Sequence, residues 1–145
     1  MSGLARAARR GEQGVALLEA ALVLPILLML VMGTVDLGRA VYIRNALANA
    51  ARDGARFAIV DPRNTTCIKT VAARYSSLAN LTASDVTVTP PGTFDLGQPI
   101  TVAVQSDYRP ITPLIASAVG ASTLTLRANA TMQIRNVPSS SLACP

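Results

Sequence analysis

Histidine is absent from this chain, and its aromatic residues are three tyrosines and two phenylalanines. The lack of histidine excludes His-based catalytic triads and removes the commonest protein ligand for transition metals. The sequence has no glycine-rich phosphate-binding loop, and beyond its apolar N-terminal part no two carboxylates stand at a catalytic spacing. We therefore expect a protein that is not an enzyme and that needs no metal or cofactor.

Charge is scarce as well, because 14% of the residues are charged while 50% are hydrophobic. The net charge is +5; residues 1–14 hold three arginines and one glutamate (+2), which leaves +3 for the remainder. Nucleic-acid binding needs a basic stripe with aromatic residues among it, and this sequence has neither. The composition indicates one small domain attached to a membrane anchor.

The longest hydrophobic run is GVALLEAALVLPILLMLVMGTV, from Gly14 to Val35. A helix of about 20 residues crosses the roughly 30 Å of bilayer hydrocarbon. A dozen Leu, Ile and Val residues contribute on the order of −0.5 kcal/mol each to insertion, whereas one carboxylate costs about +3 kcal/mol at the helix centre and less near an end. The run predicts a membrane span over residues 15–35, with the lipid bilayer around it.

Two residues of this span are unusual, and each has two interpretations. Glu19 either reaches the lipid headgroups or has a functional role, which is the default for an ionisable residue inside a span. Pro25 removes a backbone donor. It gives either a tolerated kink or a segment that bends or unwinds when the protein leaves the bilayer.

Residues 1–14 form a basic leader that we expect to be too short and polar to fold. Its arginines are expected to stay in the cytoplasm, which places the C-terminal part outside it. The alternative is an ordinary secretory signal peptide. Against it, the apolar run exceeds the usual length of about 7 to 15 residues, and no A-x-A-like cleavage site follows.

Beyond Gly33 the pattern becomes that of an amphipathic helix, which we expect to project from the membrane over residues 36–60 and to end at Asp61-Pro62. Its apolar stripe is Ala40, Ile43, Leu47, Ala50, Gly54 and Ala58, and its polar stripe is Asn45, Asn49, Arg52 and Arg56. The apolar stripe packs either on the protein's own domain or on another subunit in a filament.

Residues 61–145 are expected to form an extracytoplasmic α/β region. A short helix within Arg63–Asn80 is predicted to place Cys67, Val71 and Tyr75 on one side. Alternating patterns predict strands over Asp85–Thr89, Ile100–Gln105 and Leu124–Arg135. The fold class is therefore α+β, with a long N-terminal helix covering the apolar face of a three-stranded antiparallel meander.

Two features of this region leave alternatives open. Ile111–Gly120 is apolar but too short to span a membrane, so it either fills the core or contacts the membrane surface or a neighbour. Cys67 and Cys144 lie where oxidation is permitted. If joined, they close a loop of almost eighty residues, which is worth up to about 4.5 kcal/mol; free thiols or an intermolecular bridge are the alternatives.

Three motifs carry a resemblance to a known family. Residues 14–25 have the form G-x-x-x-x-E-x-A-x-x-x-P, residues 33–39 G-x-x-x-x-G-R and residues 50–58 A-A-R-x-G-A-R-x-A. The chain resembles the TadE-like minor pilins, or pseudopilins, of bacterial tight-adherence (Flp-type, type IVc) pilus systems. The resemblance is strong from Gly11 to Asp61 and weaker beyond; Val15 stands where many prepilins have Phe or Met.

The resemblance implies a type IV pilin-like fold and cleavage by a prepilin peptidase between Gly14 and Val15. It also implies that Glu19 pairs with the mature N-terminus of a neighbouring subunit. Residues 15 and 19 lie on one helix face a turn apart, so an ammonium and a carboxylate there suit each other. The implied partners are the peptidase, other pilin subunits and the assembly platform in the inner membrane.

The predicted function is that of a single-pass inner-membrane minor pilin that helps to assemble or start a surface-adhesion filament, with a role in biofilm formation. The alternative is an uncleaved, signal-anchored envelope protein with an extracytoplasmic binding module. A third reading, a lectin-like or enzymatic domain on a signal anchor, has no site in the sequence. Glu19 distinguishes the first two, because a simple anchor gains nothing from a carboxylate in its span.

Overall fold

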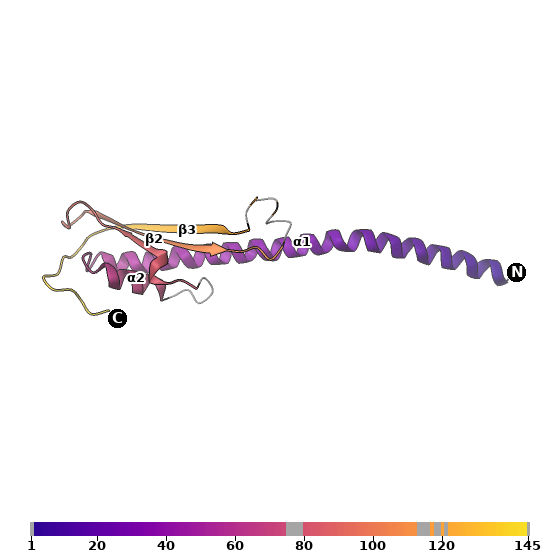
Figure 1. Ribbon diagram of the computed structural model, residues 1–145, viewed down its shortest axis with the longest axis horizontal. Coiled ribbons are helices and arrows are strands. Elements are labelled where there is room, and N and C mark those ends of the chain that lie inside the picture. The colour runs from indigo at the N-terminus through magenta and orange to yellow at the C-terminus, as the bar shows by residue number, and fades with distance from the viewer. Residues whose placement is uncertain (1, 75–79, 113–116, 118–119, 121, 145) are drawn as a thin grey trace.

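The computed structural model of the chain describes residues 2–74, 80–112, 117, 120 and 122–144, with side chains from residue 14 onward. Its elements are helices α1 (Ser2–Ala58) and α2 (Thr65–Ala73), a 3-10 turn η1 (Ala83–Asp85), and strands β1 (Val86–Thr89), β2 (Pro99–Tyr108) and β3 (Leu124–Gln133). Helix α1 runs through the whole molecule, and the other elements surround only its C-terminal half (Figure 1). The predicted α+β architecture is confirmed.

Helix α1 is longer at its N-terminus than the sequence led us to expect. It has 57 residues, begins at Ser2 and continues through Pro25 without interruption. The expectation that residues 1–14 form no structure is therefore wrong for residues 2–14. These residues extend a helix that already exists, so they avoid the cost of nucleation, and alanine and arginine favour that extension.

At its other end α1 stops at Ala58, two residues before the predicted boundary. A turn follows, in which the amide of Asp61 donates to the Phe57 carbonyl over 3.0 Å. Pro62 comes next and is fully buried, which fits the expectation that the Asp61-Pro62 pair closes the helix.

The predicted apolar stripe of α1 faces the domain. Ala40 on the stripe is half-buried and its five other members are buried, while all four residues of the predicted polar stripe are exposed. Gly54 lies where α1 is in tight contact with α2 and β2, because a Cβ there would be 3.0 Å from the Ala72 Cβ and 3.1 Å from the Val102 Cγ1. Glycine at this position lets α1 contact α2 and β2 at once.

The sheet is the predicted antiparallel meander, in the order β1-β2-β3. Strand β2 pairs with β3 along its whole length, from Pro99 opposite Gln133 to Tyr108 opposite Leu124. It is longer than predicted because Ser106 occupies an inward position and interrupts the apolar alternation, although Tyr108 resumes it. The inward residues of β2 pack on α1 and form the core with Leu47 and Ile68.

Helix α2 packs against the C-terminal part of α1. Its buried side chains are those of Cys67, Ile68 and Ala72, while Val71 is half-buried. The prediction that Val71 shares the buried side with Cys67 is therefore only partly right, and Tyr75 lies outside the described residues.

Candidate functional site

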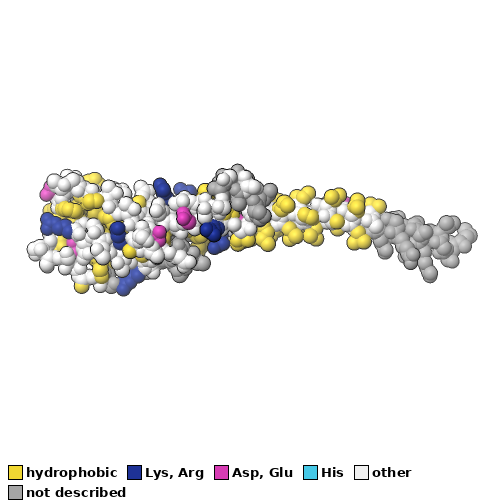
Figure 2. Space-filling model, in the orientation of Figure 1, with side chains coloured by type: hydrophobic (Ala, Val, Ile, Leu, Met, Phe, Trp, Pro, Cys, Tyr) yellow, Lys and Arg dark blue, Asp and Glu magenta, His cyan; other side chains and the backbone are white. Residues whose placement is uncertain are grey.

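The N-terminal half of the described helix stands free of the domain. Figure 2 shows hydrophobic side chains on the bare helix where it leaves the domain. An 18-residue window within Gly14–Ala58 has a mean hydropathy of 2.7, and none of it is buried. Apolar surface of this extent is unfavourable in water, so the helix fits a membrane anchor near the N-terminus.

The residues predicted to be processed or paired lie on this bare segment. No atom outside the helix comes within 4 Å of the place where a Cβ on Gly14 would sit. Val15 is 67% exposed, and Glu19 and Pro25 are exposed as well. The four residues therefore present their surfaces to surrounding molecules rather than to the protein's own domain.

A buried carboxylate marks the point where the bare helix meets the domain. Asp36, the first residue after the predicted span, is only 2% exposed. It accepts hydrogen bonds from the amides of Ile111 at 3.0 Å and Thr112 at 2.8 Å, and from the Thr112 hydroxyl. The Tyr108 hydroxyl lies 3.1 Å from the Asp36 Oδ1 and 2.9 Å from its carbonyl oxygen. These donors fix the end of β2 to α1.

The donors around Asp36 determine its charge state. The Thr112 hydroxyl, followed by the amides of Ile111 and Thr112, lowers the pKa of Asp36 to about 2. Burial raises the pKa of Tyr108, and the neighbouring Asp36 charge raises it further. At neutral pH the junction therefore holds a carboxylate stabilised by hydrogen-bond dipoles.

Sequence reasoning did not single out Asp36. One signal for it exists: position 36 precedes Ala40, Ile43 and Leu47 by four, seven and eleven residues and so lies on the same apolar stripe. A carboxylate on a buried stripe implies hydrogen-bond donors opposite it. The identity of those donors could not be inferred, because they come from a segment 72 to 76 residues away.

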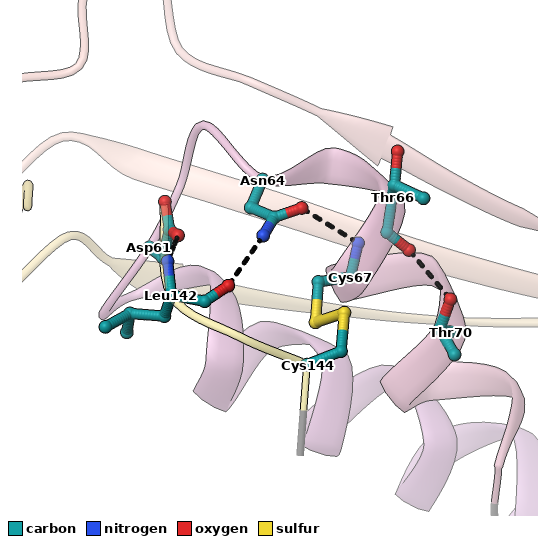
Figure 3. The surroundings of a disulfide bond; sticks show 7 residues. All are labelled: Asp61, Asn64, Thr66, Cys67, Thr70, Leu142 and Cys144. Carbon is teal, nitrogen blue, oxygen red and sulfur yellow. Dashed lines mark hydrogen bonds between the residues drawn. A yellow bond between two sulfur atoms is a disulfide. The ribbon is translucent and has the colours of Figure 1, made fainter. Parts of the chain in front are cut away.

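The C-terminal tail is fixed to the start of α2 (Figure 3). Cys67 and Cys144 form a disulfide with their Cα atoms 5.5 Å apart. The Asn64 side chain accepts from the Cys67 amide and donates to the Leu142 carbonyl, each over 3.1 Å. Asp61, which is 1% exposed, accepts from the Leu142 amide over 2.8 Å. The Asn64 side chain thus both caps α2 and binds the tail.

An open hollow of about 600 Å³ lies along the polar stripe of α1, between Tyr42 and Arg56. Its charged groups are already partnered within the helix: Arg56 lies 3.7 Å from Asp53, and Arg52 donates to Asn49. Among the residues with described side chains, no three His, Cys, Asp or Glu groups come together to hold a metal ion. Nothing in this hollow converges on a small ligand.

Comparison with known proteins adds one match. Residues 14–56 match the model of a family described as TadE-like protein. No curated protein and no solved structure matches the chain. The matched segment includes Gly14, Val15, Glu19, Pro25 and the buried Asp36. The match therefore agrees with the family predicted from the sequence over residues 14–56, which resemble the corresponding segment of TadE-like proteins.

Proposed function

We propose that this protein is a minor pilin, or pseudopilin, of a tight-adherence pilus, and that it acts structurally, without catalysis. The observation that carries the proposal is the division of α1. Its TadE-like segment begins with a bare apolar half that presents Gly14, Val15 and Glu19, and its second half is packed in a folded domain. A helix built in this way can exchange lipid for other apolar helices without unfolding the domain.

Processing begins at Gly14. The absence of a side chain and the open space around this residue suit a protease cleft that must approach the backbone closely. Cleavage after Gly14 leaves a new ammonium on Val15, one helical turn from Glu19. In the apolar surroundings of a membrane or filament either charge alone is costly, so each favours a partner of the opposite sign on a neighbouring subunit.

Removal of the leader also changes how firmly the helix is held. Arg6, Arg9 and Arg10 precede the apolar run, and drawing an arginine to the centre of a bilayer costs about 2.5 to 3.5 kcal/mol on the insertion scale. With the leader in place these residues keep the N-terminus in the cytoplasm. Without it, the assembly platform in the inner membrane can pass the apolar helix to the other pilin subunits.

The test compares the chain from its own host with the prepilin peptidase gene present and absent. We expect the mature chain, analysed by intact mass and N-terminal sequencing, to begin at Val15 only when the peptidase is present. Gly14→Val should retain the leader in both strains, while Gly33→Val, at a second open position of the same helix, should be processed normally.

A chain that keeps residues 1–14 in both strains would overturn the proposal. It would support the alternative of a permanently anchored envelope protein with a binding module.

A further inference from the structure

The end of the domain nearest the bare helix consists of the last residues of β2 and those that follow. Tyr108 and Thr112 bind Asp36, which directly follows the apolar run. Residues 108–112 therefore lie beside the point where the apolar run of α1 ends. Figure 1 shows the end of β2 beside α1, at the edge of the part of the helix that the domain leaves uncovered.

The exposed side chains at this level are of two kinds. Ile111 is 61% exposed even though its amide is fixed to Asp36, and Leu37 on the helix is 65% exposed. Arg39 and Arg109 are exposed and basic, and the Arg39 guanidinium carbon lies 5.7 Å from the centre of the Tyr108 ring. Figure 2 shows basic side chains close to the point where the apolar helix leaves the domain.

We propose that Arg39, Arg109 and Ile111 form a membrane-docking surface, which rests on the face of the bilayer on the domain's side. In this arrangement the two guanidinium groups bind the phosphates of anionic lipid headgroups, and Ile111 enters the boundary between headgroups and acyl chains. Guanidinium groups suit this role because they bind phosphate oxygens through paired hydrogen bonds.

Continuity with the span identifies the bilayer as the partner. Val35, the last residue of the apolar run, adjoins Asp36, whose carboxylate holds the backbone of Ile111. The span in lipid thus brings Ile111 to within about one helical turn of the headgroups. A second copy of this chain fits less well, because it would bring like charges together at Arg39 and Arg109.

Docking on lipid would set the orientation of the domain before any assembly. Withdrawal of α1 from the bilayer would then have to break contacts at the membrane surface as well as remove the apolar helix. The inference depends on the membrane anchor and not on the proposed pilus function, so a failure of leader cleavage would leave it standing.

The chain contains no tryptophan, so a single introduced indole reports on its own surroundings. The full chain carrying Ile111→Trp is reconstituted in phosphatidylcholine vesicles, with or without phosphatidylglycerol, and quenched by brominated lipids. Leu96→Trp is the matched control, since Leu96 is 70% exposed in the connection between β1 and β2 at the far end of the sheet. Leu37→Trp is the positive control.

We expect strong quenching for Ile111→Trp and Leu37→Trp and none for Leu96→Trp, with the signal from position 111 stronger in anionic vesicles. Adding Arg39→Gln and Arg109→Gln should lower the equilibrium constant for docking on anionic vesicles by about fivefold per arginine. The pair Arg127→Gln and Arg135→Gln, exposed on β3 and just beyond it, should leave it unchanged.

Besides displacement by free phosphate, three results would overturn the proposal: equal quenching at positions 111 and 96, equal effects of the two arginine pairs, or quenching at 111 that requires a high ratio of protein to lipid. The last would indicate contact with a second copy. Inorganic phosphate should compete no better than chloride of equal ionic strength; displacement by phosphate alone would indicate a free-anion site. As a control for folding, the urea unfolding midpoint of the Ile111→Trp variant should equal that of the unmodified chain, which would show that the domain is intact.

Discussion

The hydroxyl of Tyr108 lies 2.9 Å from the carbonyl oxygen and 3.1 Å from the carboxylate of Asp36, across 72 residues of sequence. This contact joins the last residue of β2 to the first residue of α1 beyond the apolar run. The domain is therefore fixed to its helix at the membrane end as well as through the apolar core.

Removing that hydroxyl tests the junction. Tyr108→Phe keeps the ring in the core but leaves Asp36 with one donor fewer, and we expect a loss of about 1 kcal/mol in the free energy of unfolding. Urea unfolding followed by pulse proteolysis in detergent measures it. Tyr42→Phe, at an exposed tyrosine of α1, should have no effect, and equal stability of the two variants would contradict the role assigned to Tyr108.

The ionisation of Asp36 should make stability depend on pH in acid. The folded chain holds the pKa of Asp36 at about 2, below the ordinary aspartate value of 3.8. A carboxyl whose pKa falls on folding stabilises the fold above its unfolded pKa and loses this contribution as the pH drops through the folded value. Stability should therefore decline from about pH 4 toward pH 2, and Asp36→Asn should flatten that decline. An unchanged slope in Asp36→Asn would assign the acid sensitivity to other groups.

Gly54 should not tolerate a methyl group. In Gly54→Ala the new carbon would lie 3.0 Å from Ala72 and 3.1 Å from Val102, both on packed elements. Overpacking costs about 1 to 3 kcal/mol, which exceeds the gain of up to about 1 kcal/mol in helix propensity. Thermal unfolding should thus show a lower midpoint for Gly54→Ala. Gly38→Ala, which faces open space, should raise it; the same sign for both would refute the packing argument.

Glu19 provides the sharpest functional test. Glu19→Leu removes the only carboxylate of the predicted span, so it should insert at least as well as the natural chain. We expect the chain to be cleaved after Gly14 as before but to be lost from assembled filaments, as judged by immunoblots of sheared pili. Asp53→Leu, on the outer part of the same helix, controls for the loss of a negative charge. Normal filaments with Glu19→Leu would disprove the pairing role.

Repeating patterns made most of the fold predictable. The three- and four-residue spacing identified the buried face of α1, and alternation located all three strands of the sheet. These signals are local, since each reflects one element facing one core. The starts and ends of elements were less accurate, as the helical leader and the extra residues of β2 show.

The contacts that join separate segments could not be read from the sequence. Asp36 binds residues 108–112, and Asp61 binds Leu142 across 81 residues. A buried carboxylate needs donors, but its own neighbours do not reveal which later segment supplies them. Ile111–Gly120 stays only partly tested, because residues 113–116 and 118–119 lie outside the described residues.

The disulfide between Cys67 and Cys144 encloses nearly all of the domain, including the whole sheet, within one covalent ring. A protease that cuts a single peptide bond between these residues would leave both pieces attached, one through its backbone and the other through sulfur. Wherever proteases reach the domain, a nicked domain of this kind would stay on its helix instead of being shed.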